Sequence, residues 1–264
     1  MSRAFLIRVG MDSTYGGFVS PIFPDKSFVF IPIPNVRDWG YQLDQPYDEA
    51  KTYSQLTTES GEPLSNYLPH DRIKVVDRVL ENPANLPVHN DPEFNTNTYG
   101  EKKEKKVIYS KVKDFEEGDF IVFYGTFFPC QFDFKYKDCT LSELTRMQQK
   151  KKQFYIFAYL ELKYPPIEQS YYKQYENEIQ NNAHYLRGDF EKHDKSFILK
   201  GTKDSGLIKP IRIDDGTIIG GNYYMKPEIA QYKLENKQSR GLNRCYCELN
   251  SNISNLIIKE TYPV

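Results

Sequence analysis

The segment Asp119-Phe-Ile-Val-Phe-Tyr-Gly125 says more about the fold than any other stretch of the chain. Its apolar residues are consecutive rather than alternating, which is typical of a central strand buried on both faces. Phe154-Tyr-Ile-Phe-Ala-Tyr-Leu160 is equally apolar and is the expected partner of this strand. We therefore predict a sheet whose middle is built from these two segments.

Further elements are expected on either side of these strands. Thr140-Leu-Ser-Glu143 is a capping box, with a hydroxyl at the N-cap and a carboxylate three residues later, and it predicts a helix to about Lys151. Apolar residues at helical spacing predict another helix over 71–80, which Asn82-Pro83 ends. The other expectations are strands over 5–9, 27–33, 197–200 and 208–213, a helix over 167–179, a short helix opened by Pro227, and loops over 35–60 and 83–104.

The order of these elements indicates the fold class. Strands and helices are mixed without a regular βαβ alternation, which favours an α+β fold with a mixed or mostly antiparallel sheet and peripheral helices. The 264 residues suffice to bury a substantial core. Because no repeat and no clear linker divides the sequence, we expect a single domain over 1–264, with a C-terminal extension from about 215 to 264.

Composition and charge narrow the class of protein. The 35 basic and 36 acidic residues give a formal net charge of −1, so no overall field attracts the chain to nucleic acid, and any such contact depends on a local patch. The 21 Tyr and 17 Phe favour strands and aromatic-lined pockets. The four cysteines are too few and too irregular for a secreted disulfide framework. No apolar run approaches eighteen residues, so we expect a cytoplasmic protein with no membrane partner.

The first candidate for a functional segment is Gly10-Met-Asp-Ser-Thr-Tyr-Gly-Gly17, directly after the first strand. Its paired glycines permit positive φ, and its hydroxyls and amides can form an anion-binding nest. The segment lacks the Gly-Lys-Ser/Thr of a phosphate-binding loop and the spacing of a dinucleotide fingerprint. From its residues alone, an ordinary turn and a ligand-binding loop are both open.

A second candidate is His89-Asn-Asp91-Pro-Glu93, an imidazole and two carboxylates within five residues. In an extended segment His89 and Asp91 point to the same side, so they can share a ligand, a metal ion or a proton. The alternative is a solvated loop with an Asx turn before the proline.

Three further candidates lie downstream, and each has two interpretations. His184 is either a helix-end cap or a further base or ligand, and Arg187 is either a surface charge or a contact. Ser205 is either part of a turn or a hydroxyl that faces a phosphate.

Taken in order, these segments resemble the third nucleotide-modification-associated domain family, whose members are linked to systems that hypermodify bases in DNA. The resemblance runs from about residue 5 to 215. It is carried by Asp12-Ser-Thr-Tyr-Gly-Gly17 with Ser20-Pro21, Ile31-Pro-Ile-Pro34, His89-Asn-Asp-Pro-Glu93, Gly118 to Gly125, Phe154 to Leu160, Asn182-Ala-His184 and Asp204-Ser-Gly-Leu207. The family tends to have Asp-Pro-Asp where this chain has Asp91-Pro92-Glu93. Glu93 keeps the negative charge of the family's second Asp, and its side chain is longer by one methylene. Residues 35–60 and the last fifty match nothing.

A second, shorter resemblance covers about residues 105–165. There Glu117-Gly118-Asp119, an apolar strand, a helix-bearing insertion and another apolar strand look like PUA-like barrel domains. This resemblance implies a module that binds nucleic acid or a modified base without altering it. Tyr124 is the first aromatic to test for stacking on such a base, although a position in the core is the favoured expectation for it.

The short polar motifs on loops favour an enzyme, a transferase or a hydrolase, or the substrate-binding part of one, that acts on a nucleotide or on a base in DNA beside other base-modification proteins. The family resemblance itself supplies no reaction. It names no cofactor and no definite metal. The candidate catalytic residues, for proton transfer or a divalent ion, are Asp12, His89, Asp91 and His184. The candidate substrate-binding residues are Ser13, Gly16, Gly17, Ser20, Asp119, Tyr124, Arg187 and Ser205. A non-catalytic reader of modified bases and a purely structural partner are the alternatives.

Overall fold

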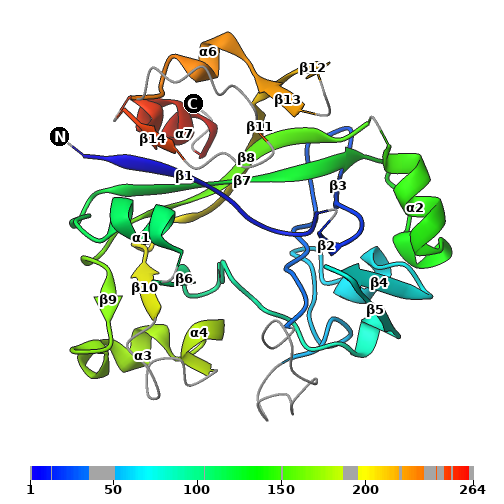
Figure 1. Ribbon diagram of the computed structural model, residues 1–264, viewed down its shortest axis with the longest axis horizontal. Coiled ribbons are helices and arrows are strands. Elements are labelled where there is room, and N and C mark those ends of the chain that lie inside the picture. The colour runs from blue at the N-terminus through cyan, green and yellow to red at the C-terminus, as the bar shows by residue number, and fades with distance from the viewer. Residues whose placement is uncertain are drawn as a thin grey trace. The chain divides into compact units, whose positions relative to one another are not determined.

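The computed structural model describes residues 2–12, 14–35, 51–103, 105–149, 151–186, 196–219, 222–234, 242, 247–250 and 252–261 (Figure 1). The chain forms two compact units. Unit 1 comprises Met1–Val9, Asp91–Gly125 and Phe154–Val264, and unit 2 comprises Gly10–Asn90 and Thr126–Gln153. Within the described residues, no helix has both the length and the apolar character that a membrane crossing requires.

The main sheet of unit 1 is built around the two apolar segments. Its strand order is β11 (Gly206–Arg212), β8 (Gln153–Glu161), β7 (Phe120–Pro129), β1 (Ala4–Arg8) and β14 (Cys247–Leu249), with β7 and β8 side by side in Figure 1. β1 pairs with β7 in parallel, while β14 and β11 pair with their neighbours in antiparallel fashion. Both central strands are buried along nearly their whole length, as their unbroken apolar runs require.

A second, three-stranded sheet of unit 1 has the order β6 (Thr98–Lys102), β10 (Ser196–Lys200) and β9 (Ile167–Glu168), and is antiparallel throughout. Ile167, Tyr172, Ile179 and Ile198 form a small apolar core between this sheet and the short helical segments that follow β9. Those segments are the 3-10 helix η4 (Tyr172–Tyr175), α3 (Glu176–Ile179) and α4 (Ala183–Leu186). The unit also contains α1 (Lys106–Val112), β12 (Asp214–Ile219), β13 (Asn222–Met225), α6 (Pro227–Ala230) and α7 (Ile253–Thr261).

Unit 2 has its own apolar core, which includes Phe18, Tyr53, Tyr136 and Leu144. One of its sheets has the order β2 (Tyr15–Gly16), β4 (Arg72–Val75) and β5 (Arg78–Glu81), and β3 (Ser20–Ile22) pairs in parallel with the second half of β7. The helical segments of this unit are α2 (Leu141–Gln148), η1 (Leu64–Tyr67), η2 (Pro83–Asn85) and η3 (Tyr136–Asp138).

The structure confirms the α+β class, with mixed sheets that are mostly antiparallel. It also confirms the strands expected near 5–9, 119–125, 154–160, 197–200 and 208–213, and the short helix at Pro227. The capping box is present in both directions: Glu143 N donates to Thr140 Oγ1, and Thr140 N donates to Glu143 Oε2. The helix after it ends at Gln148 rather than at Lys151.

The prediction of a helix over 71–80 was wrong. This segment is the β4–β5 hairpin, and Val76 takes a positive φ of 57° at its turn. Ile73 and Val75 are buried while the residues beside them are not, which is the two-residue period of a strand. The helical spacing of Ile73, Val76 and Leu80 was therefore coincidental, since a neighbouring strand rather than local propensity decides the conformation.

Three other expectations needed correction. Residues 27–33 form no strand and contain one isolated bridge, at Phe28, because Pro32 and Pro34 have no N–H and Ile31 N donates to the Ser20 hydroxyl. The helix expected over 167–179 is instead β9 followed by two single-turn helices. The loop expected over 83–104 contains β6. Of the loop expected over 35–60, residues 36–50 lie outside the described residues.

The five-strand path of the main sheet begins at β11 and ends at β14, so no closed barrel appears among the described strands. The PUA-like barrel over 105–165 therefore stays a prediction.

Candidate functional site

A tight turn in unit 1 brings Asp91 beside the middle of β6. The Glu93 carboxylate accepts hydrogen bonds from the backbone N–H groups of Asn95 and Thr96, both at 2.8 Å. Glu93 and Thr98 exchange two backbone hydrogen bonds, which reverses the chain. Gly100 N then donates to Asp91 Oδ1 at 2.8 Å. Glu93 is thus committed to building the turn, and Asp91 is the acidic residue that the turn presents.

Asn182 connects this turn to the segment that carries His184. Its Nδ2 donates to Asp91 Oδ1 and to Thr98 Oγ1, both at 3.2 Å, and its Oδ1 accepts from His184 N at 2.9 Å. Its backbone carbonyl also accepts from Leu186 N, so Asn182 acts as the N-terminal cap of α4. One buried amide therefore positions both the carboxylate and the helix turn that bears the imidazole.

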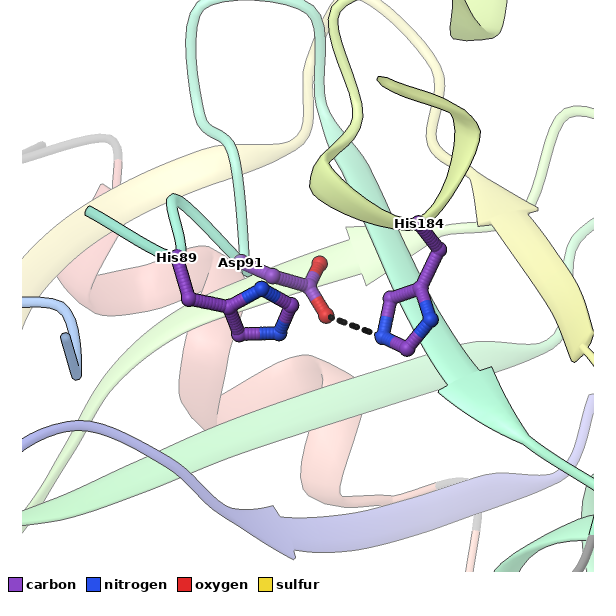
Figure 2. Close-up of side chains that lie close together, drawn as sticks. All are labelled: His89, Asp91 and His184. Atoms are coloured by element: carbon purple, nitrogen blue, oxygen red, sulfur yellow. Dashed lines mark ion pairs between the residues drawn. The ribbon is translucent and has the colours of Figure 1, made fainter. Parts of the chain in front are cut away.

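The result is a buried carboxylate–imidazole pair. Asp91 Oδ2 lies 3.7 Å from His184 Nε2, and the two side chains are only 3% and 4% exposed. Figure 2 shows the His184 ring facing the Asp91 carboxylate across this gap. The pairing carries a formal charge on both partners only when the imidazole is protonated.

His89 joins the pair from two residues upstream. One ligand atom from each of His89, Asp91 and His184 lies within 4.8 Å of the others, and all three residues are buried (Figure 2). Only Asn90 separates His89 from Asp91, so the chain itself keeps these two side chains near each other. Two imidazoles and one carboxylate at this spacing can move protons or hold a metal ion. We refer to these three residues as the His–Asp–His cluster.

The glycine segment lies outside this cluster. Asp12 Oδ1 accepts hydrogen bonds from Thr14 N at 2.7 Å and Tyr15 N at 2.9 Å, and Gly17 N donates to the Asp12 carbonyl. Gly16 and Gly17 take φ values of +109° and +83° in the turn that results. Ser13 lies outside the described residues. The structure thus shows an Asx-type turn here, and a phosphate contact at this turn stays a prediction.

The remaining candidates for substrate binding have partners within the protein. The Ser20 hydroxyl accepts from Ile31 N, and the Ser205 hydroxyl accepts from Glu161 N. The Asp119 carboxylate accepts from Arg3 and from Glu116 N. Tyr124 is fully buried, and its hydroxyl donates to the Leu242 carbonyl, so its ring is a core element rather than a stacking surface for a base. Arg187 lies outside the described residues.

Sequence reasoning missed the residues that assemble the cluster. The sequence pattern assigns Asn182 no role of its own, and it predicts a loop at Thr98 and Gly100. A usable signal existed for Asn182, because asparagine is a preferred N-cap and it directly precedes the turn of helix that carries His184. No comparable signal marks Gly100, whose importance depends on a contact with residues more than eighty positions away.

Comparison with known proteins adds the family. No curated protein and no solved structure matches the chain. A family model described as nucleotide modification associated domain 3 matches residues 3–218, a range that contains the whole cluster together with Gly100 and Asn182. This match covers well over half of the 264 residues, so the chain belongs to the nucleotide modification associated domain 3 family.

Proposed function

We propose that this protein is an enzyme that modifies a nucleotide or a base in DNA, with the His–Asp–His cluster as its catalytic centre. The family membership supports a role connected with nucleotide modification. The observation that carries the catalytic assignment is the burial of His89, Asp91 and His184 around a common point.

The cost of burying these groups argues for a function. A buried carboxylate is expensive unless donors surround it, and an apolar cluster of the same volume generally stabilises a fold at least as well. Here the chain supplies Asp91 with a backbone donor from Gly100 and an amide donor from Asn182. Such supported polar groups concentrate at active sites, which makes a catalytic role the better explanation of this arrangement.

The chemistry available to the chain's own residues follows from the Asp91–His184 pair. A carboxylate beside an imidazole orients the ring and stabilises its protonated form, as in general acid–base pairs. His184 can accept a proton from a hydroxyl or a base nitrogen of the substrate and return it to a leaving group. Such proton transfer can serve a group transfer as well as a hydrolysis.

The charge of the chain bears on the form of the substrate. A formal net charge of −1 gives no general attraction to the DNA backbone. A single nucleotide, or a base delivered by partner proteins of the same modification system, is therefore the substrate that we propose. We place the reaction in the cytoplasm.

The test compares the modified-nucleoside content of DNA and of the nucleotide pool in cells that carry the complete modification system. Mass spectrometry of digested nucleosides is the readout. We expect His184→Gln and Asp91→Asn to abolish the modified product. His70→Gln is the matched control, since His70 is exposed and lies outside the cluster. Unchanged product in folded His184→Gln protein would overturn the assignment.

A further inference from the structure

We propose that His89, Asp91 and His184 bind one divalent transition-metal ion, with Zn²⁺ as the expected occupant. The proposal deepens the proposed function by assigning a cofactor to the same cluster, and in the loaded protein His184 serves as a ligand of the ion rather than as the general base. It rests on the proposed function for the location of the site. Metal binding is measured without any turnover, so the two proposals can be tested separately.

The donor set favours a transition-metal ion over Mg²⁺ or Ca²⁺. Two imidazoles and one carboxylate are the three protein ligands of many catalytic zinc sites, in which further positions are left for water or substrate. The same set suits Fe²⁺ and Co²⁺. Mg²⁺ and Ca²⁺ prefer all-oxygen surroundings, so two imidazoles in three ligands disfavour them.

The distances are close to those that a bound ion requires. With metal–ligand bonds of about 2.0–2.2 Å, two donors on a tetrahedral ion stand roughly 3.3–3.6 Å apart. Asp91 Oδ2 and His184 Nε2 are already 3.7 Å apart, and the widest separation of ligand atoms among the three residues does not exceed 4.8 Å. Small rotations of the side chains, chiefly that of His89, would bring all three donors onto one ion.

The surroundings of Asp91 have the form of an outer coordination shell. Gly100 N and Asn182 Nδ2 both donate to Oδ1, which holds the carboxylate with Oδ2 toward His184. Asn182 also accepts from His184 N, so one residue orients two of the proposed ligands. Outer-shell partners of this kind fix ligand geometry and typically contribute about 10–100-fold to metal affinity.

Charge favours an ion at this position as well. With both imidazoles neutral the cluster carries one negative charge, contributed by Asp91, in an environment that is almost closed to water. A divalent cation compensates that buried charge directly.

The experiment uses the full chain, stripped of metal with a chelator and titrated with Co²⁺, whose visible absorption reports coordination by protein ligands. We expect one Co²⁺ per chain, displaced by Zn²⁺ and not by millimolar Mg²⁺. His184→Gln and Asp91→Asn should each weaken Co²⁺ binding by more than about 100-fold, beyond the usual effect of an outer-shell change. His89→Gln should do the same, and His70→Gln should bind like the wild type.

Circular dichroism of each variant shows whether it is folded, and His89→Gln tests the proposal from a separate segment should the other two fail to fold. The proposal is overturned if the wild type takes up no stoichiometric Co²⁺, or if the cluster variants bind it as tightly as His70→Gln does. If metal-free protein still modifies nucleotides, the proposed metal site is wrong and the proposed function is supported. If the protein binds one Co²⁺ per chain but modifies no nucleotide, the metal site is supported and the proposed function is wrong.

Discussion

Gly100 and His184 are packed so closely that a Cβ atom at position 100 would lie 2.5 Å from Cδ2 of the imidazole ring. The same Cβ would stand 2.7 Å from Asn182 Oδ1. Real Cβ atoms essentially never approach other heavy atoms to within 3.0 Å, so a side chain here forces the ring and the amide away. Gly100 is thus a positioning residue for the cluster through the absence of its side chain.

Gly100→Ala should therefore displace His184 while leaving the β6–β10 pairing in place. We expect a loss of stability of about 1–3 kcal/mol, the usual cost of overpacking, and at least a tenfold weaker affinity for Co²⁺. Urea unfolding and the Co²⁺ titration measure the two effects.

Gly61→Ala is the control for this substitution. Gly61 has a φ of +81°, and no atom lies within 4 Å of the point that a Cβ would occupy, so its replacement strains only a surface turn of unit 2. It should destabilise the protein without changing metal affinity. Equal effects of both variants on Co²⁺ binding would contradict the positioning role of Gly100.

Asn182→Asp keeps the size of the side chain and changes its charge. The new carboxylate would stand where Nδ2 now lies 3.2 Å from Asp91 Oδ1, and two buried negative charges would face each other. An uncompensated buried charge costs about 3–5 kcal/mol, so we expect a loss of that order in the free energy of unfolding. Asn181→Asp is the matched control, because Asn181 is the adjacent residue and is exposed. Similar stabilities of the two variants would argue against the Asn182–Asp91 contact.

Glu62, a residue of unit 2, should make the free energy of unfolding depend on pH. Hydrogen bonds from Lys135 Nζ at 2.5 Å and from the Tyr67 hydroxyl at 2.6 Å lower the pKa of the Glu62 carboxyl. A lowered folded-state pKa means that this stabilisation is fully present above about pH 4.3, the ordinary value for glutamate, and is lost as the pH falls through the lowered value.

Glu62→Gln should accordingly reduce the free energy of unfolding at pH 7, and the difference from wild type should vanish at low pH. The Glu62 side chain is 41% exposed, so solvent screening keeps the expected loss below about 1 kcal/mol. Urea unfolding between pH 7 and pH 3 measures it, with the exposed Glu59→Gln as control. A difference in the free energy of unfolding between wild type and Glu62→Gln that grows as the pH falls would contradict this prediction.

Cys130 should be chemically inert in the folded protein. Burial raises the pKa of its thiol to about 12, so almost no thiolate exists near neutral pH. We expect iodoacetamide at pH 8 to label Cys130 about 1000-fold more slowly in the native protein than in urea, because the thiolate is the reactive form.

Mass spectrometry of the alkylated peptides gives the rates. Cys139 serves as an internal comparison, because it is only partly buried and should react faster than Cys130. Rapid labelling of native Cys130 would show that its surroundings open readily to solvent.

The sequence by itself determined those elements whose conformation is set by residues close to one another along the chain. The unbroken apolar runs of β7 and β8 and the capping box at Thr140 specify their structures through interactions within the segment or through simple burial. The proximity of His89 to Asp91 is likewise a property of two residues separated by one other.

Tertiary structure decided what depends on partners far along the chain. Residues 71–80 became a hairpin despite a helical spacing of apolar residues, because strand pairing outweighs weak propensity. The cluster required Asn182 to reach Asp91 across 91 positions, and Gly100 to leave room for His184. Side-chain periodicity reports which face of a segment is buried, but not which distant side chain will meet it there. The sequence therefore supplied the ligands of the proposed site, and only packing brought them together.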